Sequence, residues 1–128
     1  MKSITSAWLA AHDDLTLIRE IIHNETLSHL VAFHSQQAIE KTFKAVLEEF
    51  DGIVPKMHTL ETLIARVTRH VVLNIELELL EDLDKLYIDA RYPGDFGLLP
   101  NGKPTVSDAE KFNELAMLIN SIVIKSLN

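Results

Sequence analysis

Helix-breaking residues are confined to two short parts of this chain. Of all its sequence features, this distribution most strongly limits the folds that the chain can adopt. Gly52 and Pro55 mark the first break, and all the other glycines and prolines fall between residues 93 and 104. Because glycine and proline interrupt helices, the long stretches without them are free to form helices. In those stretches apolar residues recur at spacings of three and four, the period of an amphipathic helix. The sequence therefore predicts an all-α protein.

The first two helices are predicted over residues 3–23 and 24–50. Ser3 and Asn24 stand at their starts, where a side-chain oxygen can accept hydrogen bonds from unpaired backbone N–H groups. The apolar stripe of the first helix consists of Trp8, Ala11, Leu15, Ile18 and Ile22, and that of the second of Ile39, Phe43, Val46, Leu47 and Phe50. Both stripes should face a common core.

Three further helices complete the prediction. The third covers residues 58–70, the fourth follows Asn74 as its cap, and the last begins with a capping box of Ser107 and Glu110. Their inward residues are Leu60, Leu63, Ile64 and Val67; Leu79, Leu83, Leu86, Tyr87 and Ala90; and Ala109, Phe112, Leu115, Ala116, Ile119, Ile122 and Val123. Residues 71–80 alternate apolar with polar side chains, as a strand would, but their continuing helical spacing favours a helix.

These elements predict an up-and-down antiparallel bundle of four or five helices in a single domain over residues 1–128. The absence of cysteine excludes disulfides and thiolate metal sites. No stretch resembles a signal peptide or reaches the length of a membrane span. We therefore expect a cytoplasmic protein without membrane contact.

A net charge of −7 speaks against a general nucleic-acid binder, but it leaves room for a local basic strip. His34, Gln37, Lys41 and Lys44 share one face of the second helix, where two ammonium groups one turn apart could hold a phosphate or nucleotide. Alternatively, the face is simply solvated, with Glu40 and Lys44 forming a helical ion pair of about 0.3–0.5 kcal/mol.

Arg91 stands at the predicted end of the fourth helix, and three roles are open to it. It can interact with the terminal carbonyl groups of the helix. It can bind a phosphate or a partner's carboxylate through two hydrogen bonds, with Tyr92 and Asp95 as neighbours in a long loop. It can also pair with Asp84, two helical turns earlier.

The histidines do not form a metal site by spacing, because neither His12 and Glu20 nor His29 and His34 stand at the three- or four-residue interval that helical metal sites use. His58, at a helix start, is predicted to form a structural hydrogen bond to a neighbouring helix. No catalytic set, metal or cofactor is predicted.

Three segments together resemble the HEPN family of small helical bundles. The first is AFHSQQAIEKTFKAVLEEF at residues 32–50, similar to the Gln-Gln-Ala-x-Glu-Lys signature of that family's second helix. The second is His58-Thr59-Leu60 followed by Leu63, and the third runs from Tyr87 to Arg91-Tyr92-Pro93. Their order and spacing cover essentially the whole chain.

The resemblance implies a bundle that is often dimeric and acts in nucleotide binding, RNA cleavage or toxin–antitoxin pairing. Nuclease members of the family place an arginine and a histidine over the scissile phosphate, with a longer gap than the three residues found here between Arg19 and His23 or between Arg66 and His70. Arg91 has no histidine after it. The chain therefore resembles the branch without the usual nuclease pair.

From these observations we expect a homodimeric binding subunit without autonomous catalysis. It would pair with a separately encoded minimal nucleotidyltransferase, as in toxin–antitoxin pairs, and hold a nucleotide or RNA phosphate near Lys41, Lys44 and Arg91. Two alternatives stay open. One is a metal-independent toxin ribonuclease with a non-standard site, and the other is a purely structural interaction module.

Overall fold

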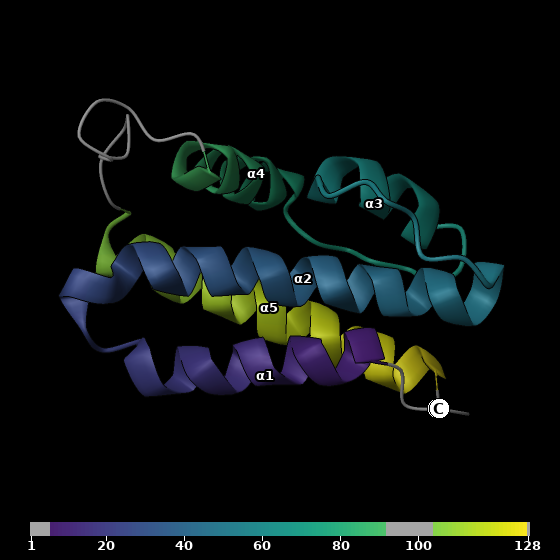
Figure 1. Cartoon of the computed structure of the whole chain (residues 1–128), viewed down its shortest axis with the longest axis horizontal. Helices are drawn as coiled ribbons and strands as arrows, with labels where there is room; N and C mark the ends of the chain where they lie inside the picture. Colours follow the sequence, from purple (N-terminus) through teal and green to yellow (C-terminus); the bar gives the residue numbers. More distant parts are fainter. Residues whose placement is uncertain (1–5, 92–103, 128) are drawn as a thin grey trace.

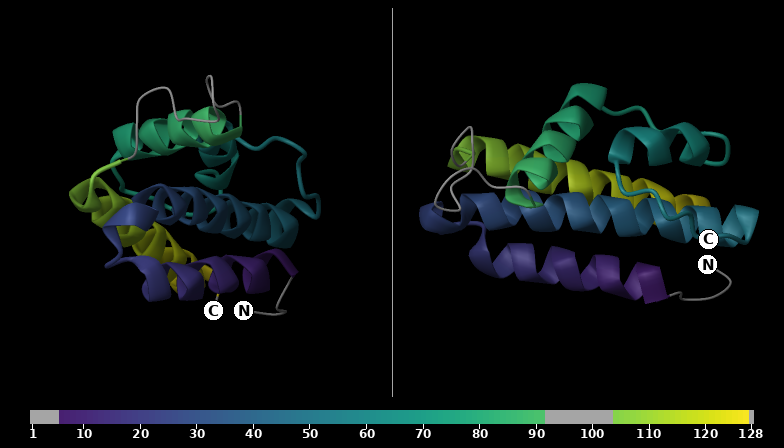
Figure 2. Two further views of the ribbon diagram at one scale, coloured as in Figure 1. Left: turned by 60° about the vertical axis from the view of Figure 1, so that its left-hand side comes forward. Right: turned by 45° about the horizontal axis from the view of Figure 1, so that its top comes forward.

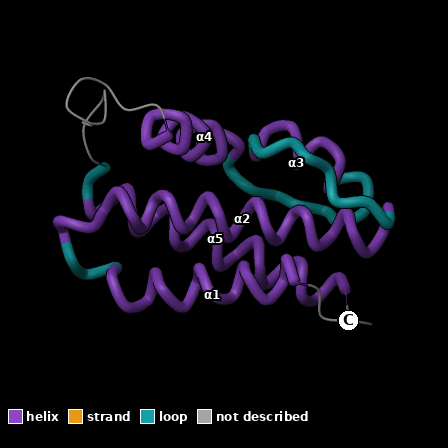
Figure 3. Tube along the Cα trace, in the orientation of Figure 1, coloured by secondary structure: helices purple, strands orange, loops and turns teal. Residues whose placement is uncertain are grey.

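The computed structural model describes residues 6–91 and 104–127, without the side chains of residues 89–91 and 127. Its α-helices are α1 (Ser6–Ile21), α2 (Ser28–Asp51), α3 (Leu60–Val67), α4 (Leu77–Arg91) and α5 (Val106–Leu127), with a short 3₁₀ helix over Glu25–Leu27. Within the described ranges there is no strand (Figure 3), and the predicted all-α class is confirmed.

Helix α2 is the axis of the bundle and packs against each of the other α-helices. Helix α1 runs antiparallel along one side of it, while α3 and α4 lie on the opposite side (Figure 1). The turned views show α4 crossing over α2 and α5 rather than running alongside them (Figure 2). Helices α1 and α2 are therefore antiparallel as predicted, whereas α5 runs in the same direction as the neighbouring α2 and α4 crosses both, with α3 placed beside the C-terminal half of α2.

One apolar core joins side chains from all five α-helices that the structure describes. It includes Trp8 of α1, Phe43 of α2, Leu63 of α3, Leu83 of α4 and Phe112 of α5. All of these belong to the apolar stripes predicted from the helical period. The stripes are buried because each helix can remove its apolar side from water only by facing the others.

Helix α2 ends at Gly52, close to the predicted break. The backbone of this residue is left-handed, with φ of 72°, and its N–H group donates to the carbonyl oxygen of Glu48 over 3.1 Å. A left-handed residue that closes the last turn in this way is typical of helix C-termini, and glycine adopts it without a steric penalty.

The predicted caps of α2, α4 and α5 are wrong. The capping box of α5 is formed by Thr105 and Asp108 instead of Ser107 and Glu110, since α5 begins at Val106. The Asp108 N–H donates to Thr105 Oγ1 over 3.0 Å, and the Thr105 N–H donates to Asp108 Oδ2 over 3.4 Å. A hydroxyl residue followed three positions later by an acid occurs at both places, two residues apart. The sequence pattern alone therefore could not choose between the two registers.

Asn24 caps the 3₁₀ helix rather than α2, because its Oδ1 accepts from the Thr26 N–H over 3.1 Å and α2 begins only at Ser28. The predicted cap Ser3 lies outside the described residues.

The segment that resembled a strand is an extended connection. Helix α3 ends at Val67 and α4 begins only at Leu77, so Asn74 is not its cap. Between the two helices, Val71, Leu73 and Ile75 pack on the core while the residues between them are exposed. The alternation of apolar and polar side chains thus reflects an extended chain lying on the bundle without a neighbouring strand.

Phe50 was predicted to face the core, but 46% of it is exposed. It stacks on the ring of His70, with the centroids 4.8 Å apart, at the end of α2. In α4 the fully buried Leu80 joins the core, although the predicted stripe did not include it. The helical period predicts which side of a helix faces the core to within one residue. The neighbouring elements then decide which residues at the edge of that side are buried.

The contrast between two phenylalanines of α2 can be tested by truncation. Phe43→Ala should lower the free energy of unfolding by about 3–5 kcal/mol, because Phe43 is fully buried and the change leaves a cavity. Phe50→Ala should cost roughly 1 kcal/mol or less, since much of its ring already meets water. Urea denaturation followed by circular dichroism measures both, and equal losses would contradict this assignment of the core.

Candidate functional site

The basic side chains predicted on one face of α2 are paired with two buried carboxylates. The first is Asp14, which reaches this face from α1. Its Oδ2 accepts from Lys41 Nζ over 2.7 Å, and its Oδ1 lies 2.9 Å from His34 Nδ1. Because an ionised carboxylate only accepts, His34 carries its proton on Nδ1 when the imidazole is neutral. Lys41 and His34 are therefore held together by one acid from the neighbouring helix.

The second carboxylate is Glu40 of α2 itself. Its Oε2 accepts from Lys44 Nζ over 3.0 Å and lies 3.2 Å from His58 Nδ1, while its Oε1 accepts from Gln36 Nε2 over 3.2 Å. Gln36 also contacts the carbonyl oxygen of His58, and Gln37 donates to Gln36 Oε1 over 2.6 Å. The signature of α2 thus forms a connected polar network that reaches the segment before α3.

This network has two consequences for the predicted residues. The expected hydrogen bond from His58 to a neighbouring helix is confirmed by its contact with Glu40. The ion pair of Glu40 and Lys44 is also present, and it leaves only 12% of the Lys44 side chain exposed, against 31% for Lys41. Lys41 is consequently the more accessible of the two lysines.

A third buried carboxylate, Asp84 of α4, caps α3. Its two oxygens accept from the backbone N–H groups of Leu60 and Glu61 over 2.8 and 3.2 Å. Burial raises the pKa of the Asp84 carboxyl above its usual value of 3.8, the two N–H donors partly offset this, and the negative charge of Glu40 adds to the rise. Asp84 is thus the acid that fixes the start of α3 on α4.

Aromatic contacts place the end of α4 beside the first half of the α2 face. Tyr87 stacks on Phe33 with ring centroids 6.1 Å apart, and Phe33 meets the ring of His34 edge to face at 5.2 Å. Arg91 is the last residue of α4, one helical turn beyond Tyr87. Its side chain lies outside the described residues, as do Tyr92 and Asp95, so their predicted contacts stay predictions.

The charges of this face nearly cancel. Asp14 and Glu40 carry two negative charges, and Lys41 and Lys44 carry two positive charges, so there is little net attraction for a distant anion. Sequence reasoning found the cations but missed Asp14, which faces α2 from α1. The position of Asp14 in the first helix, four residues before Ile18 on the buried stripe, was the available signal.

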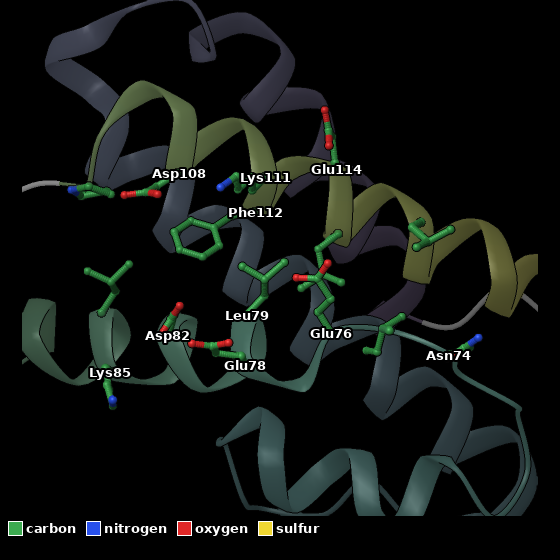
Figure 4. Close-up of a pocket in the computed structure, with 15 residues that line it drawn as sticks. Asn74, Glu76, Glu78, Leu79, Asp82, Lys85, Asp108, Lys111, Phe112 and Glu114 are labelled. Carbon is green, nitrogen blue, oxygen red and sulfur yellow. The ribbon is translucent and has the colours of Figure 1, made fainter.

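A second surface feature lies between α4 and α5. Here the structure has an open cavity of about 870 Å³, lined by apolar residues of both helices and by several charged side chains (Figure 4). The prediction from sequence did not include it, because a space between helices depends on how they cross.

No residue of either closely spaced arginine–histidine pair lines the cavity between α4 and α5. His70 Nε2 lies 2.8 Å from Asp51 Oδ1, and Arg19 and His23 are exposed at the end of α1. Among the described side chains no group of three or more acids or histidines is placed to hold a metal ion. No helix in the described parts of the chain combines the length and the apolar character needed to cross a lipid bilayer.

These features define an α-helical bundle whose central helix carries a buried Gln-Glu-Lys network. The HEPN domain matches residues 6–126, and the chain belongs to the HEPN domain family. Comparisons with curated proteins and with solved structures find no match.

Removing the cation beside buried Glu40 should be costly. Lys44→Met should lower the free energy of unfolding by about 3 kcal/mol, because it leaves a buried carboxylate with less compensation. Adding Glu40→Gln should recover part of that loss, which a double-mutant cycle in urea would measure. The control is Lys56→Met at an exposed lysine, where we expect a change within about 0.5 kcal/mol. A Lys44→Met loss no larger than that of the control would contradict the structural role.

The raised pKa of Asp84 predicts a dependence of stability on pH. The folded chain holds this proton more tightly than the unfolded chain, so the contribution of Asp84 is most favourable below the ordinary pKa of 3.8 and declines as pH rises through the raised value. The difference in unfolding free energy between the native chain and Asp84→Asn should therefore fall over this range. Urea titrations at a series of pH values measure it, and a difference that rises with pH would show the opposite sign.

Proposed function

We propose that this HEPN-domain protein is a binding subunit that receives a phosphate group, from a nucleotide or from RNA, on the α2 face at His34 and Lys41. The observation that carries the proposal is the shared contact of both side chains with Asp14, which holds them side by side at the surface. A lysine ammonium has three N–H donors, and only one of them is needed for Asp14. The others are available to a phosphate oxygen.

The other residues predicted to bind the phosphate contribute to different degrees in this proposal. Gln37 lies on the same face, and Lys44, bound to Glu40 and mostly buried, supports the face more than it contacts a ligand. Arg91, Tyr92 and Asp95 would approach from the end of α4, which the stacking of Tyr87 on Phe33 brings beside His34. An arginine there would add the net positive charge that the lysines and carboxylates of α2 do not supply.

The balance of charges also supports the need for a partner. Because Lys41 and Lys44 are neutralised within the chain, the face alone should bind an anion weakly. A separately encoded nucleotidyltransferase, as in a toxin–antitoxin pair, would supply further phosphate contacts together with the catalytic carboxylates and metal. Self-association is part of the same proposal and would use apolar side chains left exposed on the helices, such as Leu9 and Leu17 of α1.

The test is calorimetric titration of ATP and GTP into the chain, alone and with its nucleotidyltransferase. Lys41→Ala should weaken binding by roughly tenfold, the effect of losing one charge-assisted hydrogen bond. Arg91→Ala should weaken it by a similar factor. Lys56→Ala is the matched control, because Lys56 is an exposed lysine outside α1 and α2, and it should leave the affinity unchanged.

Other outcomes would favour the alternatives. If no saturable nucleotide binding occurs even with the partner present, the phosphate site is wrong. Cleavage of a defined RNA without metal, abolished by Arg91→Ala, would instead indicate a ribonuclease. Unchanged binding in every variant of the α2 face, with partner assembly sensitive only to apolar positions, would indicate a structural interaction module.

A further inference from the structure

The cavity between α4 and α5 is a groove with an apolar floor. Phe112 and Leu115 of α5 are buried beneath it, and Leu79 and Leu86 of α4 are partly buried along its side. Leu118, one turn beyond Leu115, remains 48% exposed. The groove is open because α4 packs mainly on α2 and α3 and touches α5 much less. In the described parts of the chain, Leu79, Leu86 and Leu118 therefore keep part of their apolar surface accessible.

The rim of the groove is acidic. Its charged residues are Glu76, Glu78, Asp82, Lys85, Asp108, Lys111 and Glu114. Five of these are acids and two are lysines, so the rim has a net charge of −3. Glu78 and Asp82 direct their carboxylates toward the space between the helices, while Lys85 directs its ammonium group away from it (Figure 4).

The rim acids of α4 differ from the other carboxylates of the fold. Asp14, Glu40 and Asp84 are each bound to donors within the chain. Glu78 and Asp82 form no ion pair with any described residue, although Lys85 and Lys111 line the same groove. Carboxylates without an ion pair among the described residues, beside the partly exposed Leu79, Leu86 and Leu118, create a surface complementary to a cationic amphipathic element.

We propose that this groove binds one cationic amphipathic helix of a partner protein. Apolar side chains at positions i, i+3, i+4 and i+7 of that helix would pack on Leu79, Leu86 and Leu118, as in other grooves that receive a helix. Its lysines and arginines would lie beside Glu78 and Asp82. This surface is separate from the α2 face and does not depend on phosphate binding there.

The charge of the rim disfavours other occupants. A phosphate or a nucleic acid would be repelled by the unpaired carboxylates. A second copy of the chain, which carries a net charge of −7, would bring two identical acidic rims together in a twofold contact. A cationic helix gains from both the apolar floor and the rim, so it fits the groove better than either.

The experiment measures fluorescence anisotropy of a labelled helical peptide of about 15 residues, roughly four turns, with leucines at the positions named above and lysines elsewhere. The native chain should bind it saturably. The double variant Glu78→Gln and Asp82→Asn should weaken binding by roughly tenfold, and Leu118→Ala by several-fold. Added salt should weaken binding by the native chain more than by the double variant.

Matched controls separate the groove from general charge effects. Asp13→Asn with Glu20→Gln removes two exposed acids from α1, and Met117→Ala truncates an exposed apolar residue outside the groove lining. Both should leave binding unchanged, and a peptide of the same composition with a scrambled order should bind far more weakly. Equal effects of the controls, equal binding of the scrambled peptide, or no saturable binding would overturn the proposal.

Sedimentation of the same variants tests the second-copy alternative. If the native chain is a dimer that Leu118→Ala dissociates and Met117→Ala does not, the groove belongs to self-association and the proposal is overturned. The nucleotide titrations are unaffected by either result, so the two proposals succeed or fail separately.

Discussion

The compensation of Glu40 is the interaction on which much of this structure depends. A carboxylate buried on the central helix would be strongly unfavourable without donors, because the interior solvates charge poorly. Its donors come from α2 through Gln36 and Lys44 and from the segment before α3 through His58. The buried charge therefore fixes where the chain returns to α2 after its first break. Asp84 completes the arrangement by binding the first N–H groups of α3.

Gln36, Glu40 and Lys44, which belong to the segment that resembles the second-helix signature of the HEPN family, thus hold the bundle together. Gln36 is fully buried, and Glu40 nearly so, which is not how residues that contact a ligand are usually placed. The same residues nevertheless shape the surface, since they and Asp14 determine which cations are held against the protein and which retain free donors. One helix therefore carries both the structural network and the face that we propose to bind a phosphate.

The sequence predicted the helices and their buried stripes well, because helical period and the positions of glycine and proline are local properties. It predicted helix starts less well. The capping box of α5 was displaced by two residues, and Asn24 caps a 3₁₀ turn. In both places several polar residues compete for the same unpaired N–H groups, and the choice depends on where neighbouring elements allow the helix to begin. The alternation of apolar and polar residues at 71–76 can be seen in the sequence. Only the structure explains it, because this extended segment packs its apolar side chains on the core without pairing with another strand.

The sequence by itself determined the all-α class, the second helix with its signature, and the presence of two lysines on one face. The tertiary structure decided which side chains surround those lysines, because Asp14 comes from another helix and His58 from the segment after the end of α2. It also decided that α4 and α5 leave a groove between them. The physical reason is the same in both cases. Helical period fixes the direction of side chains around one helix axis, whereas charge pairing and open space depend on the relative positions of two.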